Sequence, residues 1–328
     1  MSSGWRIRRV SAVGIATLVG AVMYCGVVTS PALAGNPSTF GINGGRNVFN
    51  APSIGYPAPG GIYAPFTDCP LNNPVMEGSV GGSATGCIAS ISTSGTFTIH
   101  GIPVSVTHPV IVQFGVWSPP TATGGNQFEG GTVMPADGRS LVDSPEQTPG
   151  GLPLLLLCPG STPDIAALCR KATTSGHTDL TALIRPAGPI TNFTLTSFTQ
   201  PVKIQLINPM LGGNCYIGSD SNPIVLNPTI TSGNLAFVAD PDPARFPNTA
   251  VLEILDAQAT DNSFSVPAAS GCGPGGSADA QIDTTLGLPS PSGSNGLVLN
   301  GNSYFADDFS SANQVDDLKA AFRASSGH

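Results

Sequence analysis

TFTIHGIPVSVTHPVIVQFGVW, residues 96–117, is the stretch that decides the fold class of this chain. Residues 96–99 and 104–107 alternate polar and apolar side chains, and a period of two predicts β-strands with one buried face. Residues 110–116 are apolar on both faces apart from Gln113, which predicts a central strand. The stretch therefore predicts neighbouring strands of a β-sheet.

Prolines and short strand-like runs punctuate the rest of the chain. Pro103 and Pro109 bracket the runs above, and strands are expected to end or to lie at an edge there because proline cannot donate to a sheet. Further strands are predicted over residues 152–157, 180–184, 193–196, 202–206, 224–226, 235–238 and 251–255. Many short strands separated by turn residues predict a mainly β protein with an antiparallel β-sandwich or barrel-like fold.

Helices are expected to be few and short. Ser311 and Gln314 have the spacing of a capping box, which predicts a C-terminal helix that docks on the sheet. The apolar residues on one face of this helix are Val315, Leu318 and Phe322. Residues 162–169 begin with Thr-Pro-Asp and predict a second, short helix that ends near Cys169. Residues 278–286 are a candidate for another.

The first 34 residues have the features of a secretory signal. Arg6, Arg8 and Arg9 precede an apolar stretch over residues 10–28, and Ala32-Leu33-Ala34 offers a cleavage site before Gly35. The alternative is an uncleaved membrane anchor, because the apolar stretch is just long enough to span a bilayer.

Three regions are therefore predicted. Residues 1–34 are a signal peptide, residues 35–66 a Gly/Pro-rich N-terminal arm, and residues 67–328 a disulfide-stapled β domain. Residues 118–151 form a Gly/Pro-rich crossing inside that domain. Loops of this length are uncommon in compact domains, so the crossing is either functional or a sub-boundary.

The cysteines predict an oxidising compartment. Cys25 lies in the signal, and the mature chain keeps an even set: Cys69, Cys87, Cys158, Cys169, Cys215 and Cys272. Six cysteines allow fifteen pairings, of which we predict the nearest-neighbour set, Cys69–Cys87, Cys158–Cys169 and Cys215–Cys272. Zinc binding is the alternative, but the chain lacks a Cys-x-x-Cys pair.

Composition excludes some partners. The net charge is −8, and cleavage of residues 1–34 would remove three arginines and no acid, giving −11. An acidic chain without a basic run is a poor candidate for binding nucleic acid or an anionic membrane surface. Only 10% of the residues are charged, and the 41 glycines and 31 prolines suit a loop-rich β protein outside the cell.

No catalytic signature is present, so an enzyme is not the favoured interpretation, and no cofactor or metal is expected. A hydrolytic couple of His177 and Asp179 is conceivable, although a loop histidine explains the pattern better. Three acid pairs lack the spacing of a calcium loop and are predicted to be solvated turn acids or helix-start acids. These pairs are Asp240 and Asp242, Asp307 and Asp308, and Asp316 and Asp317.

Two aromatic residues are candidates for ligand binding. Trp117 ends the strand-like run over 110–116, and Phe128 lies in the 118–151 crossing, so together they could form a platform that stacks on a sugar. The alternative is that Trp117 closes a strand and belongs to the core.

Two blocks resemble a group of uncharacterised exported actinobacterial proteins. Residues 205–218 contain Asn214-Cys215-Tyr216-Ile217-Gly218, and residues 264–273 end in Ser270-Gly271-Cys272-Gly273. Residues 222–226 belong to the same resemblance, which covers most of the mature chain. It supports pairing of the cysteines at 215 and 272 and implies export by a bacterium. It implies no activity, so no functional residue is carried over.

Taken together, these patterns predict a secreted or cell-wall-associated bacterial protein with a non-enzymatic structural or interaction role. The alternative is a module that binds carbohydrate or a cell-wall polymer through Trp117 and residues 118–151. A hydrolase with a site near His177 is the third hypothesis. The expected partner is a cell-envelope component or polysaccharide, with no nucleic acid and no membrane after signal cleavage.

Overall fold

The computed structural model describes residues 61–77, 85–106, 109–117, 131–135, 145–147, 163–175, 180–308 and 314–325. Its strands are β1 Gly86–Ile99, β2 Ile102–Val106, β3 Val110–Trp117, β4 Gly131–Val133, β5 Pro145–Gln147, β6 Thr181–Pro186, β7 Thr191–Thr194, β8 Ser197–Ile207, β9 Tyr216–Ile217, β10 Ile224–Leu226, β11 Thr229–Ala239, β12 Thr249–Asp261, β13 Ala269–Ser270 and β14 Gly296–Asp308. Its helices are η2 Gly61–Phe66, α3 Pro74–Glu77, α4 Pro163–Ser175, η4 Pro274–Gly276, α5 Asp279–Leu286 and α6 Gln314–Ser325.

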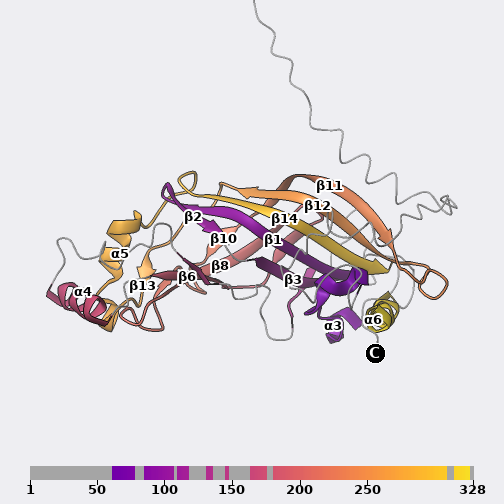
Figure 1. The fold of residues 1–328 in the computed structure, drawn as a ribbon, viewed down its shortest axis with the longest axis horizontal. Helices are drawn as coiled ribbons and strands as arrows, with labels where there is room; N and C mark the ends of the chain where they lie inside the picture. Colours follow the sequence, from indigo (N-terminus) through magenta and orange to yellow (C-terminus); the bar gives the residue numbers. More distant parts are fainter. Residues whose placement is uncertain are drawn as a thin grey trace, which may run out of the picture.

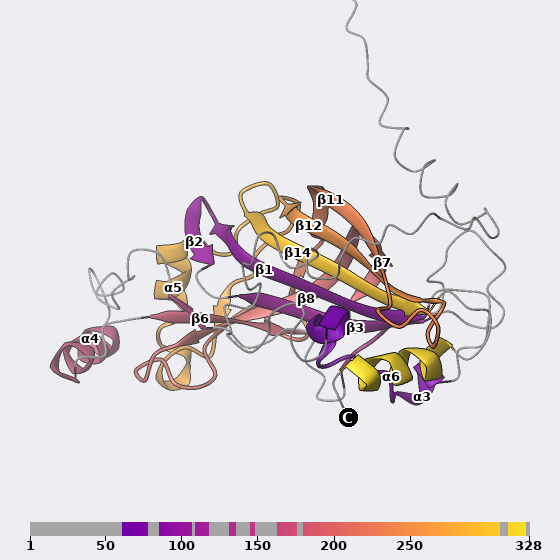
Figure 2. The same cartoon turned by 45° about the vertical axis from the view of Figure 1, so that its right-hand side comes forward.

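The body is elongated, and its long strands β1, β12 and β14 run side by side along it (Figure 1). Helices α4 and α5 lie at one end of the body, and α3 and α6 lie at the other (Figures 1 and 2). The prediction of a mainly β protein with few helices, including one at the C-terminus, is confirmed.

All described strands belong to one 14-stranded antiparallel sheet. Its central path runs β13-β9-β8-β11-β12-β14-β1-β3-β4, and the end strands β13 and β4 do not pair with each other within the described residues. The sheet is therefore not closed. Near its open side, the Thr132 hydroxyl donates to the carbonyl of Ile190, which links β4 to the start of β7.

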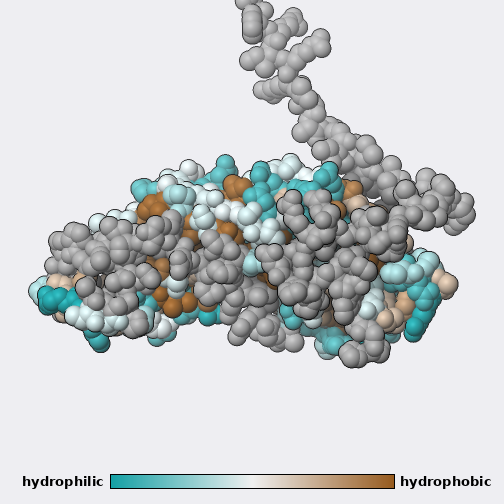
Figure 3. All heavy atoms as spheres, viewed as in Figure 1, coloured by the Kyte–Doolittle hydropathy of each residue, from teal (hydrophilic) through white to brown (hydrophobic). Residues whose placement is uncertain are grey.

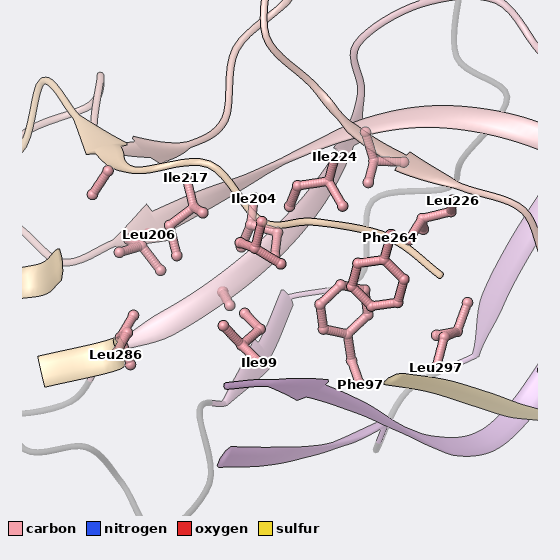
Figure 4. Close-up of a cluster of buried hydrophobic side chains, with 14 of the residues drawn as sticks. Phe97, Ile99, Ile204, Leu206, Ile217, Ile224, Leu226, Phe264, Leu286 and Leu297 are labelled. Atoms are coloured by element: carbon pink, nitrogen blue, oxygen red, sulfur yellow. The ribbon is translucent and has the colours of Figure 1, made fainter. Parts of the chain in front are cut away.

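Strand β8 divides the sheet into two layers. Its first residue, Ser197, pairs with Thr229 of β11, whereas residues 202–207 pair with β6. Layer A contains β11, β12, β14, β1, β2, β3 and β4, and layer B contains β5 to β10 with β13. The first core fills the space between the layers (Figure 4), where Phe97 of β1 packs against Phe264 at 5.3 Å between ring centroids. This arrangement is sandwich-like.

A second core lies on the outer face of layer A, under helix α6. Val315 and Leu318 of α6 are buried there and Phe322 is partly buried, as the predicted apolar face requires. The Phe322 ring lies 4.6 Å from the ring of Tyr63 and 5.7 Å from that of Phe66. Residues 61–66, the end of the predicted arm, thus form a 3-10 helix packed against the body. Ser311 of the predicted capping box lies outside the described residues.

Most predicted strands are present, with informative differences. Pro103 lies in β2, an edge strand that pairs with β1 alone among the described strands, as expected for proline. Strand β14 was not predicted, because Asn300-Gly301-Asn302-Ser303 interrupts its apolar pattern with turn-forming residues.

Helix α4 continues past Cys169 to Ser175, and the Ser175 hydroxyl donates to the Lys171 carbonyl in its last turn. The strand predicted over 152–157 lies outside the described residues.

A line of bulges crosses layer A around Gly301 of β14. Strand β1 has an extra residue at Thr93, between the pairs Ser92–Gly301 and Ser94–Asn300. Strand β12 has an extra residue between the pairs Ile254–Ser303 and Ala257–Gly301, and β11 bulges next to Gly233. Each bulge bends its strand. We call this feature the bulge line.

The bulge in β1 reverses which side chains face the first core. Before it, Ile88 faces this core and Ala89 and Ile91 face the second core; after it, Phe97 and Ile99 face the first core. One inserted residue shifts the period of two by one position, so even-numbered residues face inward before Thr93 and odd-numbered residues after it. The same strand thereby serves both cores.

We predict that Gly301→Ala destabilises the protein by about 2 kcal/mol or more, because an alanine Cβ would lie 1.9 Å from the Ile91 carbonyl oxygen. Gly296→Ala, in the same strand, is the matched control, since its Cβ would meet its nearest neighbour, Thr98, at 3.9 Å. Urea unfolding of both variants measures the difference. Equal stability of the two variants would contradict this account of the bulge line.

Candidate functional site

A groove opens on the inner face of layer A, beside the first core. Its lining comes from β1, β3, β12 and β14 on one side and from the β7–β8 hairpin and Ile230 of β11 on the other. The enclosed part of the groove has a volume of about 50 Å³, so a ligand larger than a few water molecules must extend from it onto the neighbouring open surface. We call it the inner groove.

Small residues form the floor of the inner groove. Ser90 of β1 lies directly opposite Ser303 of β14, and Ser92 lies opposite Gly301, which has no side chain. Ala259 of β12 completes this strip across the bulge line. Because larger residues at these positions would project between the layers, the groove depends on their small size.

The serine hydroxyls of the floor are available to a ligand. Within the described residues, no side-chain hydrogen bond from Ser90, Ser92 or Ser303 to the protein is formed, although the Ser92 residue is only 7% exposed. None of the three hydroxyl oxygens is among the described buried side-chain atoms that lack a partner, so water reaches them. A ligand that covers them must replace the hydrogen bonds of that water. The floor is therefore a row of neutral donors in largely apolar surroundings.

Aromatic residues of the β7–β8 hairpin form the opposite wall. Phe193 and Phe198 both make edge-to-face contacts with the fully buried ring of Phe114, at 5.3 and 5.9 Å between centroids. The hairpin turn is fixed by Thr194, whose hydroxyl oxygen accepts hydrogen bonds from the backbone N–H groups of Thr196 and Ser197. A rigid aromatic wall thus faces the hydroxyl floor.

Apolar surface continues beyond the groove onto β11. Leu235 is opposite Ile254 in the β11–β12 ladder, and Phe237 is opposite Leu252, so these side chains share the inner face. Leu235 is 62% exposed and Phe237 58% exposed. On the face shown in Figure 3, hydrophobic patches lie between hydrophilic residues.

None of the described residues that line the inner groove has a charged side chain. The nearest acid in sequence is Glu253, which alternates with the lining residues Leu252 and Ile254 and therefore points to the opposite face. Glu253 is 1% exposed, its Oε2 atom has no hydrogen-bond partner in the described structure, and burial raises its pKa to about 7. The two faces of β12 are thus electrostatically different.

Two predicted disulfides are present. Cys69–Cys87 ties the segment that carries η2 and α3 to β1, with a Cα–Cα distance of 5.8 Å. Cys215–Cys272 joins the neighbourhoods of β9 and β13, with a Cα–Cα distance of 4.1 Å. Cys169, on α4, is disulfide-bonded. Its predicted partner, Cys158, lies outside the described residues, so that bridge stays a prediction.

The surroundings of Cys272 explain the Ser-Gly-Cys-Gly block physically. The Asp279 carboxylate accepts hydrogen bonds from the backbone N–H groups of Gly271 and Cys272, at 3.2 and 2.7 Å. Gly271 has a φ of +71°, and a Cβ there would lie 2.3 Å from the Asn214 carbonyl oxygen. Only glycine fits this close approach.

The sugar-stacking pair is not brought together in the described structure. Trp117 is partly buried at the end of β3 and packs against the second core, as a strand-closing tryptophan does. Phe128, His177, Asp179 and the rest of the 118–130 segment lie outside the described residues. The carbohydrate and hydrolase hypotheses therefore stay predictions, and neither predicted aromatic lies among the residues that line the inner groove.

The first acid pair has a structural role. Asp240 accepts hydrogen bonds from the Tyr63 hydroxyl and from the backbone N–H of Asp242, both at 2.7 Å. Asp242 in turn accepts the backbone N–H of Arg245. This pair therefore fixes a turn and anchors the 3-10 helix η2.

The other acid pairs divide between the two predicted roles. Asp316 and Asp317 occupy the first turn of α6, as expected. Asp307 and Asp308 were expected to be solvated but are buried at the end of β14, and burial raises the pKa of Asp307 well above its ordinary value. Among the described residues, no group of three His, Cys, Asp or Glu side chains is placed to hold a metal ion.

Sequence reasoning missed the inner groove, although one signal of it was readable. Residues 88–92 alternate, with Ala89 and Ile91 on one face and Ser90 and Ser92 on the other. Which face would be inside could not be known, because both faces of β1 are buried.

The chain matches no family model, no curated protein and no solved structure. Its resemblance to exported actinobacterial proteins therefore stays a prediction. None of the helices in the described part combines the length and apolar character that a membrane span requires.

We predict that Glu253→Gln flattens the pH dependence of stability. The pKa of Glu253 is about 7 in the fold against 4.5 in a model peptide, so the folded state holds a proton that the unfolded state releases between these values. The bound proton therefore contributes to the free energy of unfolding. This contribution is complete below pH 4.5 and is lost as the pH rises through 7, which lowers the free energy of unfolding by about 3 kcal/mol in total. Urea unfolding from pH 4.5 to 8 measures it; parallel curves for wild type and variant would contradict the assignment.

Proposed function

We propose that this protein is exported, works at or outside a bacterial envelope, and serves as a non-enzymatic interaction protein. Its ligand would be uncharged and largely apolar, and would lie in the inner groove and along the exposed inner face of β11. The observation that carries the proposal is the groove itself: a charge-free lining with hydroxyls on its floor and aromatic rings on its wall. Small-molecule sites have this composition, mostly apolar with a few placed polar groups.

Export is supported by two independent features. Residues 1–34 have the charge, apolar run and small-residue site of a secretory signal. The disulfides Cys69–Cys87 and Cys215–Cys272 are of a kind that persists in oxidising compartments. These bridges suit a durable extracellular scaffold.

An interaction role is favoured over hydrolysis by the chemistry of the groove. Among the described residues, its lining includes serines but no histidine, aspartate or glutamate that could activate them. The described histidine, His100, lies in the hairpin turn between β1 and β2, where it is exposed. We favour the inner groove over the carbohydrate alternative because Trp117 packs on the second core and is not among the residues that line the inner groove.

The test is binding of N-phenyl-1-naphthylamine, an uncharged dye that fluoresces in apolar sites. We expect the wild type to bind it and Ser303→Phe to weaken binding at least about tenfold, because the added ring would fill the space above Ser90 and Ile254. Val298→Phe is the matched control: it adds a ring to the same strand at an exposed position of the opposite face, and its binding should be unchanged.

Folding of each variant is checked by circular dichroism and by its unfolding midpoint. If a folded Ser303→Phe protein bound the dye as tightly as the wild type, the groove would not be the site. A wild type that failed to bind the dye would overturn the proposal.

A further inference from the structure

The serine hydroxyls on the floor of the inner groove limit which ligands can bind there. This inference rests on the proposed function of the groove. Ser90 and Ser303 face each other across the β1–β14 ladder, and Ser92 is two residues further along β1. Each hydroxyl can donate one hydrogen bond, and none of the three does so to the protein within the described residues. A ligand that enters the groove displaces water from these donors.

A pure hydrocarbon would leave the displaced hydroxyls without an acceptor. Sites built to form hydrogen bonds reject analogues that lack the bonding group, because the buried polar atoms of the site are then unpaired. The floor therefore favours a ligand that carries an acceptor oxygen. The acceptor must reach a residue as deep as Ser92, which is 7% exposed.

The same lining selects against a charged ligand. The described lining contains no lysine, arginine or histidine, so a carboxylate or phosphate would lose its hydration there without gaining a cation. The nearest ionisable residue in sequence, Glu253, faces the other side of β12. The acceptor oxygen should therefore belong to a neutral group.

Apolar surface on both sides of the floor fits a hydrocarbon chain. Phe193 and Phe198 form one wall, and Leu252, Ile254 and Leu299 lie along the other strands of the lining. This surface continues onto the inner face of β11, where Leu235 is exposed. A chain of methylene groups that starts at the hydroxyl floor would follow this apolar path.

We infer that the inner groove binds an acyl chain through its neutral ester. The serine hydroxyls donate to the ester oxygens. The groove itself holds only about 50 Å³, so the chain runs from there onto the inner face of β11, where Leu235 and Phe237 are exposed. A free fatty acid has the same chain but a charged head, so it is the decisive comparison.

The experiment measures displacement of N-phenyl-1-naphthylamine by methyl octanoate and by octanoate at pH 8, two probes that differ in the charge of the head group. We expect methyl octanoate to displace the dye from the wild type and octanoate to be at least about tenfold weaker. The variant Ser92→Ala/Ser303→Ala should weaken methyl octanoate about three- to tenfold for each lost hydrogen bond. Its affinity for the dye should stay within about twofold.

Ser94→Ala is the control for serine removal, because Ser94 lies on the same strand, is exposed and does not line the groove. Displacement by octanoate as strong as by the ester, or an unchanged ester affinity in the double variant, would overturn the ester assignment while the groove remained a dye-binding site. Loss of dye binding in the wild type would instead remove the proposed function and this inference together.

Discussion

Layer A depends on the close approach of β1 to Gly301 of β14. A side chain at this position would collide with the Ile91 carbonyl, so the strands can lie this close only because residue 301 is glycine. Bulges in β1 and β12 meet the same glycine from both sides. Since a bulge bends a strand and shifts its facing pattern, one constraint sets both the bend of the layer and the choice of inward side chains.

The consequence is that one strand supports two cores and a groove. Before Thr93, β1 gives Ala89 and Ile91 to the second core under α6, and after it gives Phe97 and Ile99 to the first core. The serines between these sets face the inner groove. The hollow therefore lies where the pattern changes, beside Gly301.

Strand β12 carries a polar side chain on one face and apolar side chains on the other. Glu253 faces the outer side, where burial raises its pKa, while Leu252 and Ile254 face the inner groove. The acids that the sequence makes conspicuous serve the outer side and the strand ends, as when Asp240 accepts the Tyr63 hydroxyl. The buried Glu253 carboxyl and the described lining of the inner groove thus lie on opposite sides of β12.

The amino-acid sequence by itself determined the β class, the edge position of Pro103 and the apolar face of α6. These follow from local periods and from the missing proline N–H. The sequence allowed fifteen cysteine pairings, and the structure confirmed two of the predicted pairs, Cys69–Cys87 and Cys215–Cys272. Only the tertiary structure decided that 296–308 is a central strand and that Ser90, Ser92 and Ser303 meet in one groove. The physical reason is that the register and the bulges of a strand depend on its neighbouring strands. Asn300-Gly301-Asn302 has the composition of a turn, and only the close approach of Ile91 shows why residue 301 must be glycine.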